Sequence, residues 1–447
     1  MPLSELSLEA VILAAGLGTR MRSSLPKVLH RLAGRPLIDY ALDLAAGAGA
    51  KKPIVVLNPH QAEVASHVEG RAEVVYQREQ LGTGHAVQQV PPERLTGKRV
   101  LLLYGDMPLL TAAAVGAVVE AQAGHDAALA TVADPSLGHA RVVRGADGSF
   151  SRIVEVKDLT DEERAVQDLN VGLYCFDGDA LVQALPLLAP DNAAGELYLT
   201  DVFGMLGSVE IVELEGSEQA LGVNDRVQLA AAEAEVGRQI AARLMLSGVT
   251  FIAPETCRVE AGVEIGQDTV IEPFTIVRGR TRIGSGCHIG PHADIADSEI
   301  GDGCTIQHSW LRECRVGDGS DCGPFSKLRP GTELSDRVHV GSFAEVVRSK
   351  IGSGSAVPHF AYVGDAVVGE RVNIAAGTIT ANYDSEKKNQ TVIEDDVFVG
   401  VDTMLVAPVK LGRGSRTGAG SVVTKDVPDG ATAVGVPARA LRKKESE

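Results

Sequence analysis

The chain has 447 residues, which is enough for two or three domains, each with its own hydrophobic core. Its formal net charge of −17 excludes the basic electrostatic field that is typical of a nucleic-acid-binding protein, so we expect no nucleic-acid partner. If the protein binds a phosphate compound, we expect local basic side chains to contact the phosphate groups. No apolar stretch reaches the ~18 residues of a membrane span, no signal-peptide pattern is present, and the six cysteines lack CxxC spacing, so we expect a cytoplasmic protein with reduced thiols and no membrane contact.

The first half of the chain alternates short apolar runs with amphipathic, alanine-rich segments. The apolar runs are AVILA (10–14), IVVL (54–57), VLLLY (100–104), ALATV (128–132) and IVEL (211–214). Such alternation is typical of an α/β domain with a mostly parallel sheet. We therefore predict a Rossmann-like domain at residues 1–226.

The loop after the first run, LAAGLGTRMRSSLPKVL (13–29), combines two glycines with the cations Arg20 and Lys27. A dinucleotide fingerprint needs glycine where Met21 stands, and a Walker loop needs Gly-Lys-Ser/Thr, which is absent. The loop thus fits a turn whose free N–H groups face an anion while the two cations neutralise phosphate oxygens. The alternative is a tight turn with two surface cations.

The segment RVQLAAAEAEVGRQIAARLML (226–246) is rich in alanine, glutamate, arginine and leucine, with apolar residues at helical spacing. It predicts a connecting helix, which we place within a linker at residues 227–250.

Residues 251–447 follow a different period. Aliphatic residues recur every six positions, often before glycine, as at Ile265, Ile271, Val277 and Ile283. A period of six fits a triangular coil with one hexapeptide per side and the aliphatic residues stacked inside. The pattern resembles the hexapeptide-repeat acyltransferases, which implies a left-handed parallel β-helix. The interruption at 378–391 is expected to project as a loop, often on the binding face.

Three further segments accompany the glycine-rich loop: QREQLGTGHA (77–86), LLYGDMPLL (102–110) and GVND (222–225). Together they resemble the bifunctional family of N-acetylglucosamine-1-phosphate uridylyltransferases and glucosamine-1-phosphate N-acetyltransferases. The resemblance continues through the helix and the repeats, so it covers essentially the whole chain. It implies acetyl transfer from acetyl-CoA to glucosamine 1-phosphate, then uridylyl transfer from UTP to N-acetylglucosamine 1-phosphate with release of pyrophosphate.

The resemblance also implies an N-terminal site. Arg20 and Lys27 would clamp the UTP phosphates during catalysis, and Asp106 with Asn224 would hold Mg²⁺, which prefers oxygen ligands. For Asp106, the alternative is a helix cap after a strand. The other implied nucleotide-binding residues are Leu13, Ala14, Ala15, Gly16, Gly18, Gln77, Gly82, Thr83, Tyr104 and Gly105. The implied sugar-phosphate residues are Ala140, Glu155, Asn170 and Asn224.

A second site is implied in the repeats. His359 would take the proton of the attacking amine, and Glu345 would orient the amine or the histidine. The implied sugar-phosphate residues are Arg329, Tyr362, Asn373 and Lys388. The implied acetyl-CoA residues are Ala376, Asn382, Tyr383, Val401, Ala419 and Arg439. The resemblance further implies a homotrimer formed through the β-helix, with acetyl sites between subunits.

The chain departs from the family pattern at both sites. Ala140 and Val171 stand where glycine and threonine are common, and Val347 and Val401 replace a lysine and a serine. Arg348 or Lys350 are the candidates to supply the lost cation. These departures leave an alternative open, a sugar-1-phosphate nucleotidyltransferase whose β-helix is only structural or regulatory.

Overall fold

The structure, a computed structural model, describes residues 7–134 and 138–441. The chain divides into two compact units, Met1–Val236 and Gly237–Glu447. Helix α7 (Arg226–Leu246) lies at the position of the predicted connecting helix and contains this division. The domain boundaries at residues 226 and 251 stay predictions.

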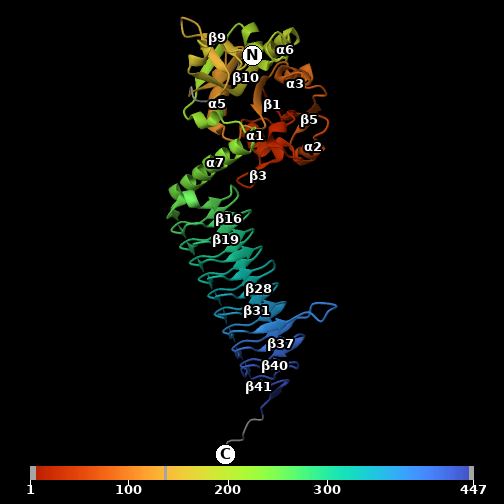
Figure 1. Ribbon diagram of the computed structural model, residues 1–447, viewed down its shortest axis with the longest axis vertical. Helices are drawn as coiled ribbons and strands as arrows, with labels where there is room; N and C mark the ends of the chain where they lie inside the picture. Colours follow the sequence, from red (N-terminus) through yellow and green to blue (C-terminus); the bar gives the residue numbers. More distant parts are fainter. Residues whose placement is uncertain (1–6, 135–137, 442–447) are drawn as a thin grey trace, which may run out of the picture. The chain divides into compact units, whose positions relative to one another are not determined.

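The N-terminal unit is built on a twisted sheet with the strand order β11-β7-β10-β6-β1-β4-β5 (Figure 1). Neighbouring strands of this sheet are parallel, except that β10 is antiparallel to both β6 and β7. Strands occupy all five predicted apolar runs, so the predicted α/β class is confirmed. The strands are β1 (Leu8–Leu13), β4 (Ile54–Leu57), β5 (Glu73–Tyr76), β6 (Arg99–Tyr104), β7 (Ala127–Ala133), β10 (Asp168–Asp177) and β11 (Val209–Glu213). Strand β8 (Arg141–Arg144) pairs with β10 and with β9 (Phe150–Val154), and β2 (Arg31–Leu32) and β3 (Arg35–Pro36) form a separate ribbon.

Helices cover both faces of this sheet, because its central strands are apolar on both sides. Ile12 and Leu103 are buried in the core on one face, and Val11 and Leu102 in the core on the other. Each strand end is thereby held between two packed layers. The helices are α1 (Leu37–Gly47), α2 (Ala62–Val68), α3 (Thr83–Gln88), α4 (Pro92–Leu95), α5 (Ala112–Ala121) and α6 (Gly178–Ala184), with 3₁₀ turns η2 (Thr19–Met21), η3 (Lys27–Leu29), η4 (Glu163–Ala165), η5 (Leu185–Leu187), η6 (Leu199–Met205) and η7 (Ser217–Ala220).

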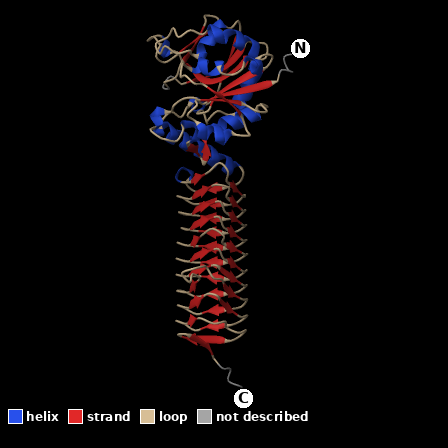
Figure 2. Cartoon of the chain, turned by 90° about the vertical axis from the view of Figure 1, so that its right-hand side faces the viewer, coloured by secondary structure: helices blue, strands red, loops and turns tan. Residues whose placement is uncertain are grey.

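The second unit is a left-handed β-helix, as the resemblance to the hexapeptide-repeat acyltransferases implies, and its coils follow the period of six. Very short strands, from β12 (Thr250–Phe251) to β42 (Ala438–Ala440), stack into three long sheets (Figure 2). Ile271 pairs with Ile289, eighteen residues later, and both side chains are buried. Three hexapeptides thus make one coil, and the inward aliphatic residues stack from coil to coil.

The interruption at 378–391 stands out from the coils, as Figure 1 shows between β31 and β37. Strand β34 (Ile379–Ala381) lies at the start of this segment, and β35 (Thr391–Ile393) resumes the stack at its end. Tyr383 and Lys388 pair across the projecting segment in an antiparallel bridge. The expected loop is therefore a small hairpin.

Within residues 7–134 and 138–441, no helix has the length and apolar character that crossing a membrane requires.

Candidate active sites

The glycine-rich loop follows β1 and is supported from behind by two buried amides. The side chain of Asn58 donates to the carbonyl oxygen of Ala15, and that of Gln61 donates to the carbonyl oxygen of Ala14, each at 3.0 Å. At Gly18 the backbone has φ +62°, and a Cβ there would lie 2.8 Å from the Cβ of Lys27. Glycine is therefore needed for the turn to lie against Lys27.

A hollow of about 240 Å³ opens above this loop. Most of the predicted nucleotide-binding residues line it: Leu13, Ala14, Ala15, Gly16, Lys27, Gln77, Gly82, Thr83, Tyr104 and Asp106. Gly18 and Gly105 lie outside its wall. A Cβ on Gly105 would come within 3.3 Å of Ala14 and Val28, so this glycine allows close packing beneath the hollow.

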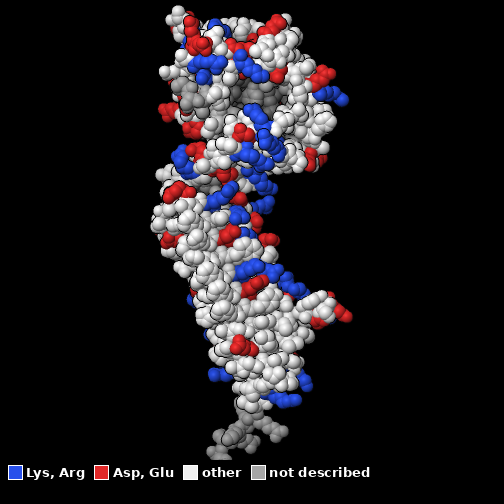
Figure 3. All heavy atoms as spheres, viewed as in Figure 1, with Lys and Arg blue, Asp and Glu red and all other residues white. Residues whose placement is uncertain are grey.

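A second hollow of about 590 Å³ adjoins the first. The predicted residues Arg20, Ala140, Glu155, Asn170 and Asn224 line it. The two hollows share four wall residues, Thr83, Tyr104, Asp106 and Glu196. Figure 3 shows this hollowed face of the N-terminal unit, with basic side chains along its rim.

A polar cluster lies where the hollows meet. The Lys27 ammonium pairs with the Asp106 carboxylate and donates to Asn224 Oδ1 at 3.2 Å, and Arg20 Nη2 donates to the same oxygen at 2.9 Å. Asp106 lies in the turn that follows β6, and Asn224 precedes α7. The fold therefore brings together a carboxylate oxygen, an amide oxygen and the two cations of the glycine-rich loop from three separate segments of the chain.

These oxygens suit a hard divalent cation. The Asp106 carboxylate and the Asn224 carbonyl both contact one positive group, the Lys27 ammonium. Among the described residues, no group of three His, Cys, Asp or Glu side chains could hold a metal. Magnesium often keeps several waters and takes one or two protein oxygens together with substrate phosphates, so this donor set fits it.

Glu155 is a partly buried carboxyl in the larger hollow. Burial raises its pKa, and the hydroxyl of Thr200, which donates to Oε1 at 2.9 Å, acts in the opposite direction. The motifs did not single out Thr200, or Glu196 and Tyr198, which line the same hollow. The alternation in ELYLT (196–200), with Leu199 buried between polar neighbours, was the available signal.

The departures in the first site lie on the wall of the larger hollow. Ala140 and Val171 both line it and are almost fully buried. His139 lies beside them, and burial lowers its pKa. All three therefore stand where they can contact a bound sugar.

In the β-helix, two of the predicted sugar-phosphate residues, Arg329 and Tyr362, form a short ladder across coils with the predicted orienting residue Glu345. Arg329 Nη1 donates to Glu345 Oε1 at 2.8 Å, and Glu345 pairs with Tyr362 on the next coil. The strands are β25 (Lys327–Leu328), β28 (Glu345–Val347) and β31 (Tyr362–Gly364). Asn373 lies on another sheet, in β33 (Asn373–Ile374).

A second column runs along one corner of the coils. Ala356 pairs with Asn373, Asn373 with Phe398, and Phe398 with Arg416. Each of these four residues is followed, three positions later, by one predicted site residue. In successive coils these site residues are His359, Ala376, Val401 and Ala419. His359 is exposed, and the side chains at Ala376 and Ala419 are small.

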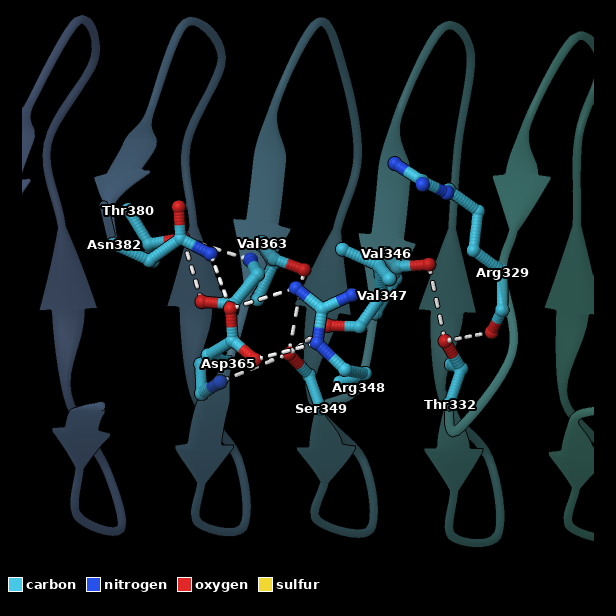
Figure 4. Close-up of polar contacts among 12 residues, drawn as sticks. Arg329, Thr332, Val346, Val347, Arg348, Ser349, Val363, Asp365, Thr380 and Asn382 are labelled. Atoms are coloured by element: carbon cyan, nitrogen blue, oxygen red, sulfur yellow. Dashed lines mark hydrogen bonds and ion pairs between the residues drawn. The ribbon is translucent and has the colours of Figure 1, made fainter. Parts of the chain in front are cut away.

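Two further groups complete the predicted set. Asn382 donates to the Asp365 carboxylate, which Arg348 holds with two bonds of 2.7 and 2.8 Å (Figure 4). On the hairpin, the Lys388 ammonium lies 5.9 Å from the centre of the Tyr383 ring. Arg439 lies in β42 at the far end of the stack, beside Lys425 and away from His359.

Both units of the chain match known protein families. Residues 10–170 match the MobA-like NTP transferase domain, and residues 262–296 match the bacterial transferase hexapeptide (six repeats). The bifunctional protein GlmU of Heliobacterium modesticaldum is 46% identical over 433 residues, which cover 95% of this chain and 94% of that protein. The chain belongs to the GlmU family. The bifunctional protein GlmU of Carboxydothermus hydrogenoformans is 45% identical over 435 residues, 96% of this chain and 97% of that one.

The GlmU match extends through both units, so the resemblance drawn from the motifs is confirmed. It does not favour the alternative in which the β-helix of this GlmU-family chain is only structural or regulatory.

Proposed function

We propose that the adjoining hollows of the N-terminal unit form the uridylyltransferase site and that the ladder and corner column of the β-helix belong to the acetyltransferase site. As a GlmU-family enzyme, the chain acetylates glucosamine 1-phosphate from acetyl-CoA and joins the product to UTP with release of pyrophosphate. The observation that carries the assignment is the cluster of Lys27, Arg20, Asp106 and Asn224 where the hollows meet.

In the uridylyl step, UTP lies in the smaller hollow and the sugar phosphate in the larger one. Gln77 donates from Nε2 to the carbonyl oxygen of Gly82 at 2.9 Å, which leaves Oε1 to accept the N–H of the uracil ring. A sugar-phosphate oxygen attacks the α-phosphorus, and pyrophosphate leaves from the opposite side. Lys27 and Arg20 stabilise the charge on the phosphate oxygens.

We propose Mg²⁺ as the metal and Asp106 with Asn224 as its protein ligands. When bound, Mg²⁺ would neutralise phosphate charge and orient the triphosphate. Lys27, which contacts both oxygens in the ligand-free protein, would then be released to the phosphates.

In the acetyl step, His359 takes a proton from the amine of glucosamine 1-phosphate as nitrogen attacks the thioester carbon, and CoA leaves as the thiol. Arg329, held by Glu345, contributes to the phosphate site. The corner column from His359 to Ala419 spans three coil steps, or about 15 Å at ~4.8 Å per step, which suits an extended pantetheine arm.

Arg348 is better placed than Lys350 to supply a phosphate cation beside Val347. A Cβ on Gly364 would lie 2.6 Å from the Tyr362 hydroxyl and 2.7 Å from Asn382 Nδ2, so both groups rest against this glycine. Arg348 is bound to the same Asp365 as Asn382, as Figure 4 shows. Lys350 pairs with Glu333 on a different sheet.

We propose a homotrimer whose neighbouring chains complete each acetyl site. A ridge of exposed or partly exposed rings runs along the β-helix to Phe360, which follows His359: Phe274, His292, His308, Phe325, Phe343 and Phe360. Packing against another copy would cover these rings and shield the exposed His359. The second copy would contribute its hairpin to the site.

We propose a cytoplasmic location, which the substrates and the thiols support. UTP and acetyl-CoA are intracellular metabolites, and all six cysteines are unpaired, as expected in a reducing compartment.

The direct experiment incubates the purified chain with glucosamine 1-phosphate, acetyl-CoA, UTP and Mg²⁺, and then omits each in turn. Release of CoA without UTP establishes the acetyl step. Release of pyrophosphate with pre-acetylated sugar but without acetyl-CoA establishes the uridylyl step. Pyrophosphate release without any CoA release would instead support a structural role for the β-helix.

A further inference from the structure

The first residues of α7 hold the backbone of Asn224. Asp225 lies directly before the helix, and its Oδ1 accepts from the backbone amides of Val227 and Gln228, each at 2.9 Å. In return, Oε1 of Gln228 accepts from the backbone amide of Asn224 at 2.8 Å. This arrangement extends the capping box, in which a glutamine or glutamate of the first turn accepts from the backbone amide of the N-cap residue. Here the amide belongs to the residue before the cap, Asn224.

A backbone bond ties the same segment to the other proposed metal ligand. The amide of Val223 donates to the carbonyl oxygen of Asp106 at 2.9 Å. The backbone of Asn224 is therefore fixed on both sides, by the amide before it and by Gln228 after it. Because the first of these bonds joins two backbone groups, the side chain of Gln228 is the part of this support that a substitution removes.

The side chain of Asn224 depends on two cations in the ligand-free protein. Its Oδ1 accepts from Arg20 at 2.9 Å and from Lys27 at 3.2 Å. The proposed uridylyl step uses both cations for the phosphates of UTP, so both bonds are lost when the metal and the nucleotide bind. The bond from the Asn224 amide to Gln228 involves neither cation. It therefore continues to hold the residue in the loaded enzyme.

We propose that Gln228 is a positioning residue for the metal ligand Asn224. By fixing the amide, it keeps Oδ1 of Asn224 beside the Asp106 carboxylate after the cations have moved to phosphate. Gln228 lines the larger hollow and not the smaller one, so it acts on UTP through Asn224 and the metal. Partners that orient a metal ligand typically account for about 10- to 100-fold in metal affinity. The inference rests on the proposed uridylyltransferase function and its Mg²⁺ ligands.

The test removes the acceptor oxygen and keeps the length of the side chain. Gln228→Met has no oxygen to accept the Asn224 amide, whereas Gln228→Glu keeps one. Val227→Ala is the matched control, since Val227 is the neighbouring residue on α7, is 79% exposed and lines neither hollow. Gln228 is itself exposed, so no variant leaves a cavity in the core.

Calorimetry measures the binding of a methylene-bridged UTP analogue that cannot be cleaved, both as its Mn²⁺ complex and without metal in EDTA. Mn²⁺ takes the same carboxylate and carbonyl ligands as Mg²⁺. In Gln228→Met the Mn²⁺ complex should bind about tenfold more weakly, while the metal-free analogue should bind within about twofold of the unmodified chain. Gln228→Glu and Val227→Ala should bind the Mn²⁺ complex within about twofold of the unmodified chain.

The proposal is overturned if Gln228→Met binds the Mn²⁺ complex within about twofold of the unmodified chain, or if it weakens both forms of the analogue equally. It is also overturned if Gln228→Glu loses as much affinity as Gln228→Met. Failure of the proposed function would look different, because the unmodified chain itself would then release no pyrophosphate from UTP and the sugar phosphate.

Discussion

The two candidate sites are assembled in different ways. In the N-terminal unit, strand ends and loops from separate parts of the chain converge, and Lys27 contacts both Asp106 and Asn224 directly. In the β-helix, each coil contacts only the coils next to it, so the predicted residues form ladders along a surface, with His359 exposed. A sheet edge can enclose a ligand within one chain, whereas a coil needs a second surface.

The largest effect is expected at the β-helix. His359→Ala should lower CoA release about 10³-fold, because the amine loses its base, and leave uridylyl transfer to pre-acetylated sugar unchanged. The thiol released with glucosamine 1-phosphate and acetyl-CoA measures the loss. His339→Ala is the control, since His339 pairs with Asp321 at 2.6 Å elsewhere in the coils. An equal loss in both variants would refute a specific role for His359.

The corresponding change in the N-terminal unit is Asp106→Ala. Pyrophosphate release should fall at least about 10²-fold through loss of a metal ligand, with the acetyl step unaffected. In EDTA, UTP binding measured by calorimetry should be retained, because Lys27 loses its carboxylate partner and is free for phosphate. Unchanged pyrophosphate release would rule out the metal assignment.

A smaller effect is expected in the pH dependence of sugar binding. Glu155 must be ionised to accept hydrogen bonds from the sugar hydroxyls, and burial raises its pKa. As the pH is lowered, kcat/KM for the sugar phosphate should therefore begin to fall at a higher pH than it would if Glu155 had the pKa of an exposed glutamate. Thr200→Val removes a bond that favours the ionised form, so the pKa rises and the acid limb moves further upward. Thr200→Ser keeps the hydroxyl and should leave the limb in place; a shift in both variants contradicts the assignment.

The smallest effect is expected for Arg348→Ala. The KM for glucosamine 1-phosphate in the acetyl step should rise about fivefold, with the KM for acetyl-CoA unchanged. Arg371→Ala is a matched control, since Arg371 forms the same two-bond pair with Asp396 at 2.7 and 3.1 Å. If the two variants behave alike, the Arg348 pair with Asp365 is only structural.

The sequence predicted what is repeated or local. The period of six predicted the coils because every inward position, such as Ile271 and Ile289, has to be buried. The glycine-rich loop predicted its own turn, since the conformation of Gly18 is set within the loop.

What the sequence missed depends on tertiary contact. Thr200 reaches Glu155 across 45 positions, and Tyr174 reaches Asn170 only through an irregular strand. The short hairpin of β8 and β9 lacks a continuous apolar run, and the run LYCF (173–176) of β10 was not among the predicted strands, so the pattern of runs did not reveal these elements. Their positions depend on packing against β6 and β7.

The contrast between the sites is tested most directly by mixing inactive chains. Co-assembly of His359→Ala chains with Asn382→Ala/Lys388→Ala chains should restore about a quarter of the acetyl-transfer activity, because a quarter of the shared sites then combine an intact histidine with an intact hairpin. Mixing Asp106→Ala with Asn224→Ala chains should restore no uridylyl transfer. The account is contradicted if the first mixture stays inactive or if the second recovers.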